Sequence, residues 1–235
     1  VTGIEISELK ERLIDYERPT TVESDTCSLI IFGVPVVRED RTEVSSLAIF
    51  LLKNKNMITL RTDELDSINN FKKQLIEKNP KYFDSLTRTV QVLLEKVIDV
   101  YFDHMDRFHD LADHIEENVI ANPKKTSIEG VFKIRTSMVF FHKALIANRE
   151  VILSIEKAHL KKLSQKEVKV FREMYEDVMQ LIDTCDTLRS ILTEIMDLYT
   201  SASANQMNEA IKKLTLVASY VLIPTLIASI YGMNF

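Results

Sequence analysis

The sequence predicts an α/β portion followed by an all-helical portion whose last helix enters a membrane. Strand-like runs occur only before residue 80, and helical periodicity fills the remainder of the chain. No charged residue occurs from Leu214 to Phe235, a run long enough to cross a bilayer as a helix. These observations divide the chain into an α/β unit at 1–80, an acidic helix hairpin at 81–160, a stalk helix at 164–213 and a membrane helix at 214–235.

Composition excludes several classes of protein. Hydrophobic residues make up 46% of the 235 residues, enough for a substantial core, and the presence of only four glycines favours long helices. The net charge of −5 argues against nucleic acid as a partner. Cys27 and Cys185 fit neither a disulfide nor a metal pattern, which indicates a reducing compartment. Because the chain starts at Val1 and shows no signal peptide, we expect a fragment of a longer protein.

The α/β unit is expected to combine two helices with three strands. Helical periodicity covers 4–16, ending at Glu17-Arg18-Pro19, and 65–76, ending before Asn79-Pro80. Strands are expected at 27–34, 44–52 and 57–61, with a turn at 53–56 between the last two. The unit is expected to be incomplete at its N-terminus.

The first long helix, at about 84–121, has an apolar stripe and an acidic stripe on opposite faces. The apolar stripe comprises Leu94, Val97, Tyr101, His104, Phe108, Leu111 and Ile115. The acidic stripe comprises Asp99, Asp103, Asp106, Asp110, Asp113 and Glu117. Like charges at this spacing repel by a few tenths of a kcal/mol per pair, so basic partners, counter-ions or a divalent cation are expected to compensate. A solvated acidic face and a cation-collecting surface both remain open.

Three histidines on this helix do not form a metal site. Their spacing of five residues turns each by about 140° around the helix, so His104, His109 and His114 cannot share one ion. His104 lies in the apolar stripe and is expected to pack in the core.

Two further helices are expected, and the second of them determines the architecture. A helix at 127–158 pairs with the first as an antiparallel hairpin. Ser164–Glu167 is a capping box, and seventy helical residues after it make a rod of about 105 Å. Its apolar residues follow a heptad pattern: Met174, Val178, Leu181, Cys185, Leu188, Leu192, Ile195, Tyr199 and Ala202. Such a rod must pack along copies of itself or along the hairpin, and it continues without a break into the membrane segment.

One face of the membrane segment has the character of a pore lining. Lys212 and Lys213 precede the segment and place that end in the cytoplasm. The face comprises Asn208, Ile211, Thr215, Ala218, Leu222, Thr225, Ser229 and Gly232. Symmetric copies would form a narrow tube of hydroxyls and small side chains, through which Mg²⁺, which dehydrates reluctantly, could pass with its water attached. Alternatively, the hydroxyls bond to their own backbone or to a neighbouring helix.

The end of the chain, Tyr231-Gly232-Met233-Asn234-Phe235, resembles the Gly-Met-Asn signature that closes the first membrane helix of the CorA family. Residues further upstream agree with the same pattern: Tyr199, Ser201, Ser203, Asn205, Asn208, Lys213-Leu214-Thr215, Thr225 and Ile227-Ala228. The resemblance covers nearly the whole chain and is densest in the last seventy residues. The structural context of a capped helix that enters a membrane supports it.

The resemblance implies a prokaryotic plasma-membrane homopentamer that takes up Mg²⁺, with most of this chain in the cytoplasm. It implies that Asn234, with Gly232 and Met233, captures hydrated Mg²⁺, and that pore rings fall on Asn208, Ile211, Leu214, Leu222 and Thr225. Cytosolic Mg²⁺ would also bind Glu173 and an acid of a neighbour's α/β unit, with Glu39 or Asp40 the nearest equivalents, and so close the pore. One departure is Pro224, which directly precedes Thr225 where the family has a residue between them.

Alternatives to Mg²⁺ transport come from the same fold and from a different class. Transport of Zn²⁺, Co²⁺ or Ni²⁺ would use the same signature. A single-pass, membrane-anchored coiled-coil sensor or scaffold would also have a stalk and one membrane helix. An enzyme is not expected, because the sequence has no nucleophile-base pairing, phosphate-binding glycine loop or His-Glu metal motif.

Overall fold

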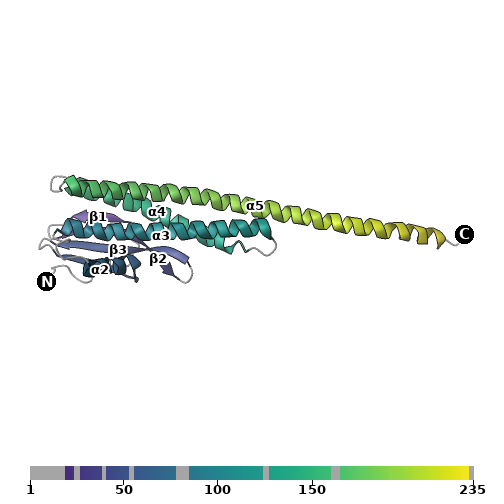
Figure 1. Cartoon of the computed structure of the whole chain (residues 1–235), viewed down its shortest axis with the longest axis horizontal. Coiled ribbons are helices and arrows are strands. Elements are labelled where there is room, and N and C mark those ends of the chain that lie inside the picture. The colour runs from purple at the N-terminus through teal and green to yellow at the C-terminus, as the bar shows by residue number, and fades with distance from the viewer. Residues whose placement is uncertain are drawn as a thin grey trace.

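The computed structural model describes residues 19–23, 27–38, 41–52, 56–77, 85–123, 127–159 and 165–232. A four-stranded antiparallel sheet packs against a group of long helices, and the last helix extends far beyond the rest of the molecule (Figure 1). The predicted helix at 4–16, Glu39, Asp40, Ser164, Met233 and Asn234 lie outside the described residues. The predicted class, an α/β portion followed by helices and a very long final helix, is confirmed.

The sheet has the order β1-β2-β3-β4, with β1 at Thr20–Glu23, β2 at Cys27–Arg38, β3 at Arg41–Leu52 and β4 at Met57–Arg61. Side chains alternate between its two faces, as the period of two in a strand requires. Ile30, Phe32 and Leu47 belong to the main core, whereas Ile31 and Phe50 belong to a smaller apolar cluster on the opposite face. The three predicted strands are confirmed, but β2 and β3 are longer than predicted and β1 was not predicted.

Strand β2 continues through Pro35 because the nitrogen of this residue needs no partner in the sheet. The pairing of β1 with β2 ends at Ile31, so no described strand pairs with this edge of β2 from Phe32 onward. Gly33, two residues before Pro35, directs its N–H and C=O to that open edge, where helices contact them. By the period of two, Pro35 points its nitrogen to the same open edge, the position in a sheet at which proline is tolerated.

A buried polar clamp joins this open edge to the helices. Asn148 accepts a hydrogen bond from the Gly33 N–H (2.8 Å) and donates one to the Gly33 carbonyl (2.9 Å). Tyr101 donates a third bond to the same carbonyl (3.1 Å). A Cβ on residue 33 would lie 3.1 Å from Val44 Cγ1 and 3.2 Å from the Ala144 Cβ, so glycine permits the close approach. The side-chain amide of Asn148 therefore bonds to β2 in the way that another strand would.

Helices α2 (Asp66–Glu77) and α3 (Leu86–Ala121) follow the sheet. Ser85 caps α3 by accepting a hydrogen bond from the Arg88 N–H (3.0 Å). The predicted apolar stripe is buried or half-buried with one exception: Leu111 is 42% exposed, and the neighbouring Ala112 takes the core position. The prediction for Leu111 was wrong because three-four spacing after Phe108 fits Ala112 as well as Leu111, and Ala112 is the residue that faces the core.

His104 is buried, as predicted, and lies among the rings of Phe108 and Phe141. Burial, with a smaller effect of Arg107, lowers the pKa of His104 below its usual value. The unfolded chain therefore binds a proton at this residue at a higher pH than the folded chain does, and stability falls as the pH drops through about 6.5.

We expect the unfolding temperature to fall between pH 7.5 and 5.5 by less in His104→Phe than in the wild type. An equal fall in both proteins would exclude this contribution.

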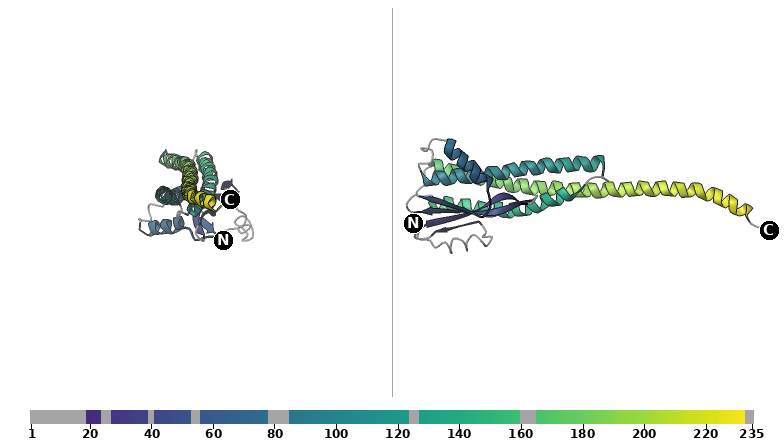
Figure 2. Two further views of the ribbon diagram at one scale, coloured as in Figure 1. Left: turned by 90° about the vertical axis from the view of Figure 1, so that its right-hand side faces the viewer. Right: turned by 90° about the horizontal axis from the view of Figure 1, so that it is seen from below.

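Helices α4 (Glu129–His159) and α5 (Gln165–Tyr231) complete the chain. Helix α5 has 67 residues, about 100 Å, and its first half is covered by α3 and α4 (Figures 1 and 2). The predicted heptad positions from Met174 to Ile195 are buried, and Tyr199 and Ala202 are half-buried. Beyond Ala202, α5 has no neighbour among the described elements, so the hairpin covers only the N-terminal half of the rod.

Candidate ion pathway and regulatory carboxylates

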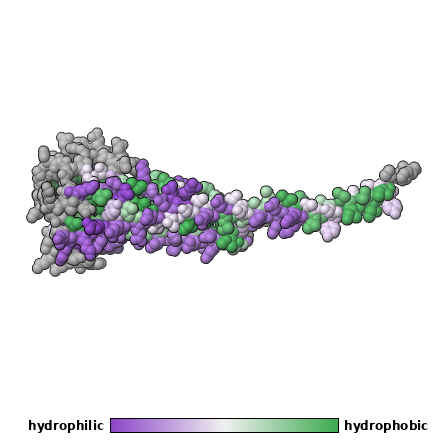
Figure 3. Space-filling model, turned by 90° about the horizontal axis from the view of Figure 1, so that it is seen from above, coloured by the Kyte–Doolittle hydropathy of each residue, from purple (hydrophilic) through white to green (hydrophobic). Residues whose placement is uncertain are grey.

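The predicted pore face lies on the part of α5 that no other described element of the chain covers. Every residue from Met207 to Gly232 is exposed, including Leu214 at 71% and Leu222 at 67%. The most apolar stretch of α5 is long enough to cross a bilayer, and none of it is buried. Figure 3 shows hydrophobic residues gathered near the far end of this helix, whereas the coloured surface of the rest of the molecule mixes hydrophilic and hydrophobic residues. An apolar helix end this exposed requires lipid or other subunits around it.

The pore face keeps a regular helical backbone through its predicted members. Asn208, Ile211, Thr215, Ala218, Leu222, Thr225 and Ser229 all lie on α5, and the spacing of the predicted face places them along one side of the helix. Leu214, a pore position that only the resemblance implied, lies on the same helix. The Thr215 hydroxyl donates to the Ile211 carbonyl (2.9 Å), and the Thr225 hydroxyl donates to the Val221 carbonyl (2.8 Å). These are the backbone bonds that the sequence left open as an alternative. They occupy the hydroxyl protons but leave oxygen lone pairs free to accept.

Two backbone features lie near the C-terminal end of α5. Pro224 lies inside α5 and has no N–H to donate to the carbonyl one turn earlier, and α5 curves toward this end (Figure 2). Gly232 ends the helix by donating its N–H to the Ala228 carbonyl (2.9 Å). A Cβ on residue 232 would lie 3.1 Å from the Ala228 carbonyl oxygen. Glycine therefore suits this close approach to the preceding helical turn.

Glu173 belongs to a group of carboxylates contributed by α3 and α5. Its side chain is 55% exposed and contacts Lys169 (3.4 Å). Burial raises the pKa of Asp177, and the charges of Asp99, Glu173 and Glu176 raise it further. Asp99 itself is paired with Lys96 (2.6 Å). Asp177 is therefore close enough to Asp99, Glu173 and Glu176 for their charges to act on it.

Asp177 is not among the residues predicted for the site, although the sequence carries a signal for it. Asp177 follows Glu173 by four residues, and such residues are neighbours on one face of a helix. Its proximity to Asp99, 78 positions earlier, depends on the packing of α3 against α5 and has no local signal. Among the described residues, no group of three metal-binding side chains is already arranged around one point.

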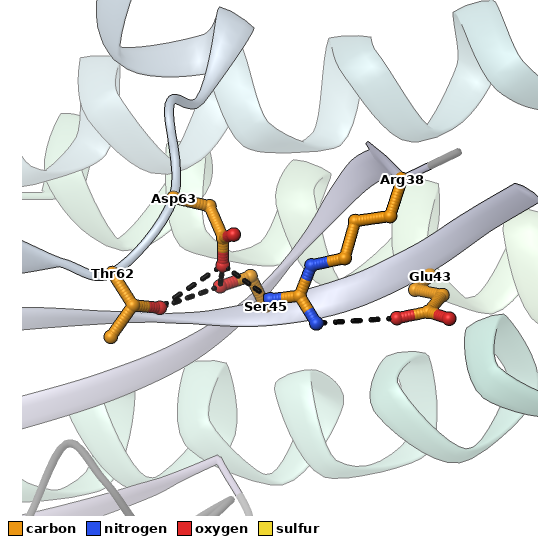
Figure 4. A network of polar contacts seen from close by, with 5 residues as sticks. All are labelled: Arg38, Glu43, Ser45, Thr62 and Asp63. Carbon is orange, nitrogen blue, oxygen red and sulfur yellow. Dashed lines mark hydrogen bonds and ion pairs between the residues drawn. The ribbon is translucent and has the colours of Figure 1, made fainter. Parts of the chain in front are cut away.

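The β2–β3 hairpin that carries Glu39 and Asp40 is anchored by a polar network (Figure 4). Arg38 donates to Glu43 (3.3 Å) and to Asp63 (2.7 Å), and Ser45 and Thr62 also donate to Asp63. Partial burial alone would raise the pKa of Asp63, but these hydrogen bonds and the Arg38 charge hold it below its usual value. The network fixes the hairpin up to the two candidate regulatory acids.

The acidic stripe of α3 is exposed throughout: Asp99, Asp103, Asp106, Asp110, Asp113 and Glu117. All six lie on the face opposite the buried side of α3. His114 is exposed and His109 is half-buried beside them, so these two histidines do not share the core position of His104.

A sheet unit on a helical stalk that enters a membrane defines a class of membrane protein with a large extramembrane domain. The chain belongs to the family described as CorA-like Mg²⁺ transporter protein, which matches residues 2–235. The members of this family are transporters rather than enzymes. Membership of the chain in this family is consistent with the single candidate membrane helix among the described residues.

Individual relatives agree with this assignment. A cobalt/magnesium transport protein CorA from Methanocaldococcus jannaschii is 31% identical over 235 residues, which cover 99% of this chain and 74% of that protein. The complete structure of the CorA magnesium transporter from the same organism gives a TM-score of 0.86 at 30% identity, again over 99% of this chain and 74% of that one. A cobalt/magnesium transport protein CorA from Thermotoga maritima is 26% identical over 238 residues, covering 99% of this chain and 67% of that protein.

Proposed function

We propose that the protein is a homopentameric channel in a prokaryotic plasma membrane that takes up Mg²⁺, driven by the membrane potential. The observation that carries the proposal is the continuity of α5 from a packed cytoplasmic unit into an uncharged, wholly exposed apolar end. Relatives named as magnesium and cobalt transport proteins support Mg²⁺ as substrate and keep Co²⁺ as an alternative. In this proposal 1–80, 81–160 and 164–213 are cytoplasmic and 214–235 crosses the membrane.

The pore hydroxyls are oriented to suit a hydrated cation. Water bound to Mg²⁺ directs its hydrogens outward, so a pore that holds the hydrated ion must offer acceptors. Because Thr215 and Thr225 donate to their own helix, their oxygens face other groups as acceptors only. Leu222 lies between them and would form an apolar constriction that closes by losing its water.

Selectivity is assigned to Asn234, with Gly232 and Met233, at the outer end of this tube. Regulation is assigned to Glu173, with Asp177 and Asp99 nearby, together with Glu39 or Asp40 of a neighbouring subunit. Mg²⁺ bound between subunits would hold the stalks together and the pore shut. As cytosolic Mg²⁺ falls, the carboxylates would repel one another and release the stalks.

Uptake by the full-length protein, compared for Mg²⁺, Zn²⁺, Co²⁺ and Ni²⁺ in proteoliposomes, tests the proposal. We expect Mg²⁺ flux that stops when the membrane potential is collapsed. Flux of Zn²⁺ without Mg²⁺ would reassign the substrate, and absence of any flux from an assembled, inserted protein would favour a membrane-anchored scaffold.

Glu173→Ala should weaken inhibition of uptake by cytosolic Mg²⁺. Loss of one carboxylate ligand from a divalent site typically changes affinity by about tenfold or more, so the inhibitory concentration should rise by that factor. Glu194→Ala, another exposed acid on α5, is the matched control and should leave the concentration unchanged. If both variants and the wild type were equally sensitive to inhibition by Mg²⁺, Glu173 would have no regulatory role and would be an ordinary surface residue.

A further inference from the structure

The outer face of α4 carries large apolar side chains that the chain itself does not cover. Phe132 is 50% exposed, Val139 51% and Phe140 44%. They lie on the side of α4 opposite its buried residues, such as Met138, Phe141 and Leu145. A solvated helix face is normally polar, so three large apolar residues on one face indicate a contact with another surface.

The same face carries positive charge without a partner in the described part of the chain. Two other cations of α4 are paired: Lys133 contacts Glu129 (3.1 Å) and Arg149 contacts Glu150 (2.7 Å). Arg135 and Lys143, which flank Val139 and Phe140, form no ion pair with any described residue. The face therefore combines an apolar centre with two cations available for an acidic partner.

The outer face of α3 is complementary in charge. None of its exposed acids from Asp103 to Glu117 forms an ion pair with a described residue. Leu111, 42% exposed, adds an apolar residue beside Asp110. Because each outer face is turned away from the shared core, one chain cannot bring its own α3 acids onto its own α4 cations. Viewed along the long axis, α3 and α4 lie on different sides of α5 (Figure 2).

The register of the hairpin places these opposite charges at the same height. The Phe141 ring lies against Tyr101 (4.9 Å), His104 (5.9 Å) and Phe108 (5.8 Å), which sets Phe141 level with His104. The two helices are antiparallel, so a step forward on α4 corresponds to a step back on α3. Arg135, six residues before Phe141, is therefore level with Asp110, six after His104. Lys143, two residues after Phe141, is level with Phe102, directly beside Asp103.

We propose that the outer face of α4 docks on the outer face of α3 of a second copy of this chain, with Arg135 opposite Asp110 and Lys143 opposite Asp103. This inference rests on the proposed symmetric assembly, because rotation about an axis along the stalk keeps every residue at its own height. Residues that lie at the same level along the stalk in one chain therefore lie at the same level in its neighbour, so Arg135 and Lys143 can meet the neighbour's Asp110 and Asp103. The contact repeats around the ring and compensates the acidic stripe, and the apolar centre of α4 becomes covered.

Directed cross-linking tests the contact in the full-length protein in detergent. One subunit carries Arg135→Cys and one tag, and a co-expressed subunit carries Asp110→Cys and a second tag, so only different chains can form the engineered disulfide. We expect a cross-linked pair carrying both tags, and none when Lys72→Cys on α2 replaces Arg135→Cys. Cys185 is buried, and burial raises the pKa of its thiol to about 12, so it does not compete. The wild-type chain controls for Cys27.

Charge reversal gives a second, independent readout. Arg135→Glu with Lys143→Glu should lower the fraction of assembled protein on dilution by roughly tenfold, because like charges then oppose one another across the contact. Adding Asp103→Lys and Asp110→Lys should restore assembly, whereas Lys72→Glu with Lys73→Glu should have no effect. An assembled oligomer without the cross-link, or without the rescue, overturns this contact alone. A wild-type protein that stays monomeric overturns the proposed channel instead.

Discussion

Asn234→Ala is expected to abolish Mg²⁺ uptake by the full-length protein while leaving its assembly intact. In the sequence, Asn234 follows by two residues Gly232, the last residue described after α5. In the proposed ring, each copy contributes one amide to the water shell of the ion. At about 1 kcal/mol for each lost hydrogen bond, a ring of several amides loses enough to reduce capture by more than about a hundredfold.

The control for this experiment is Gln180→Ala, which removes an exposed amide from the cytoplasmic part of the same helix. Both variants are compared with the wild type by Mg²⁺ flux into proteoliposomes and by the size of the detergent-solubilised oligomer. Flux retained in an assembled Asn234→Ala protein would contradict the selectivity role and leave the Gly-Met-Asn segment with a structural role in closing the helix.

Helices were predictable from this sequence because their periodicity is long and uninterrupted. The predicted starts and ends of α2, α3 and α4 fall within about two residues of the observed ones, as expected where caps such as Ser85 and breakers such as Pro123 mark the ends. The burial of His104 followed from its place in the apolar stripe. The same reasoning failed at Leu111, because regular spacing does not distinguish Leu111 from Ala112, and Ala112 is the buried one of the two.

Strands were less predictable because pairing, rather than local sequence, defines them. Strand β1 has only four residues and forms through its pairing with residues 28–31 of β2. Strand β2 extends past Pro35 because one of its edges is open, which the sequence does not show. For the site, the resemblance selected Glu173, whereas the proximity of Asp99 to Asp177 emerges only when α3 and α5 are packed together.

The contact with the least local signal is the clamp of Asn148 on Gly33, and Asn148→Ala is expected to have the largest effect on stability. The substitution removes two hydrogen bonds and leaves the buried N–H and carbonyl of Gly33 without the amide. An unsatisfied buried polar group costs about 1–3 kcal/mol, so the free energy of unfolding should fall by roughly 2–5 kcal/mol. Tyr101→Phe removes only the third bond and should cost about 1 kcal/mol.

Thermal unfolding of the detergent-solubilised protein and hydrogen exchange at Gly33 together measure this effect. Asn118→Ala is the matched control, because Asn118 bonds to a carbonyl of its own helix at an exposed position. If Asn148→Ala lowered the unfolding temperature no more than Asn118→Ala did, β2 would be held by apolar packing alone.

The distinction matters for gating, since in the proposed mechanism the acids at the β2–β3 hairpin act on the stalk of a neighbour. Such an action requires that the sheet and the helices move as one body, and Asn148, Tyr101 and Gly33 form the buried polar connection that holds them together.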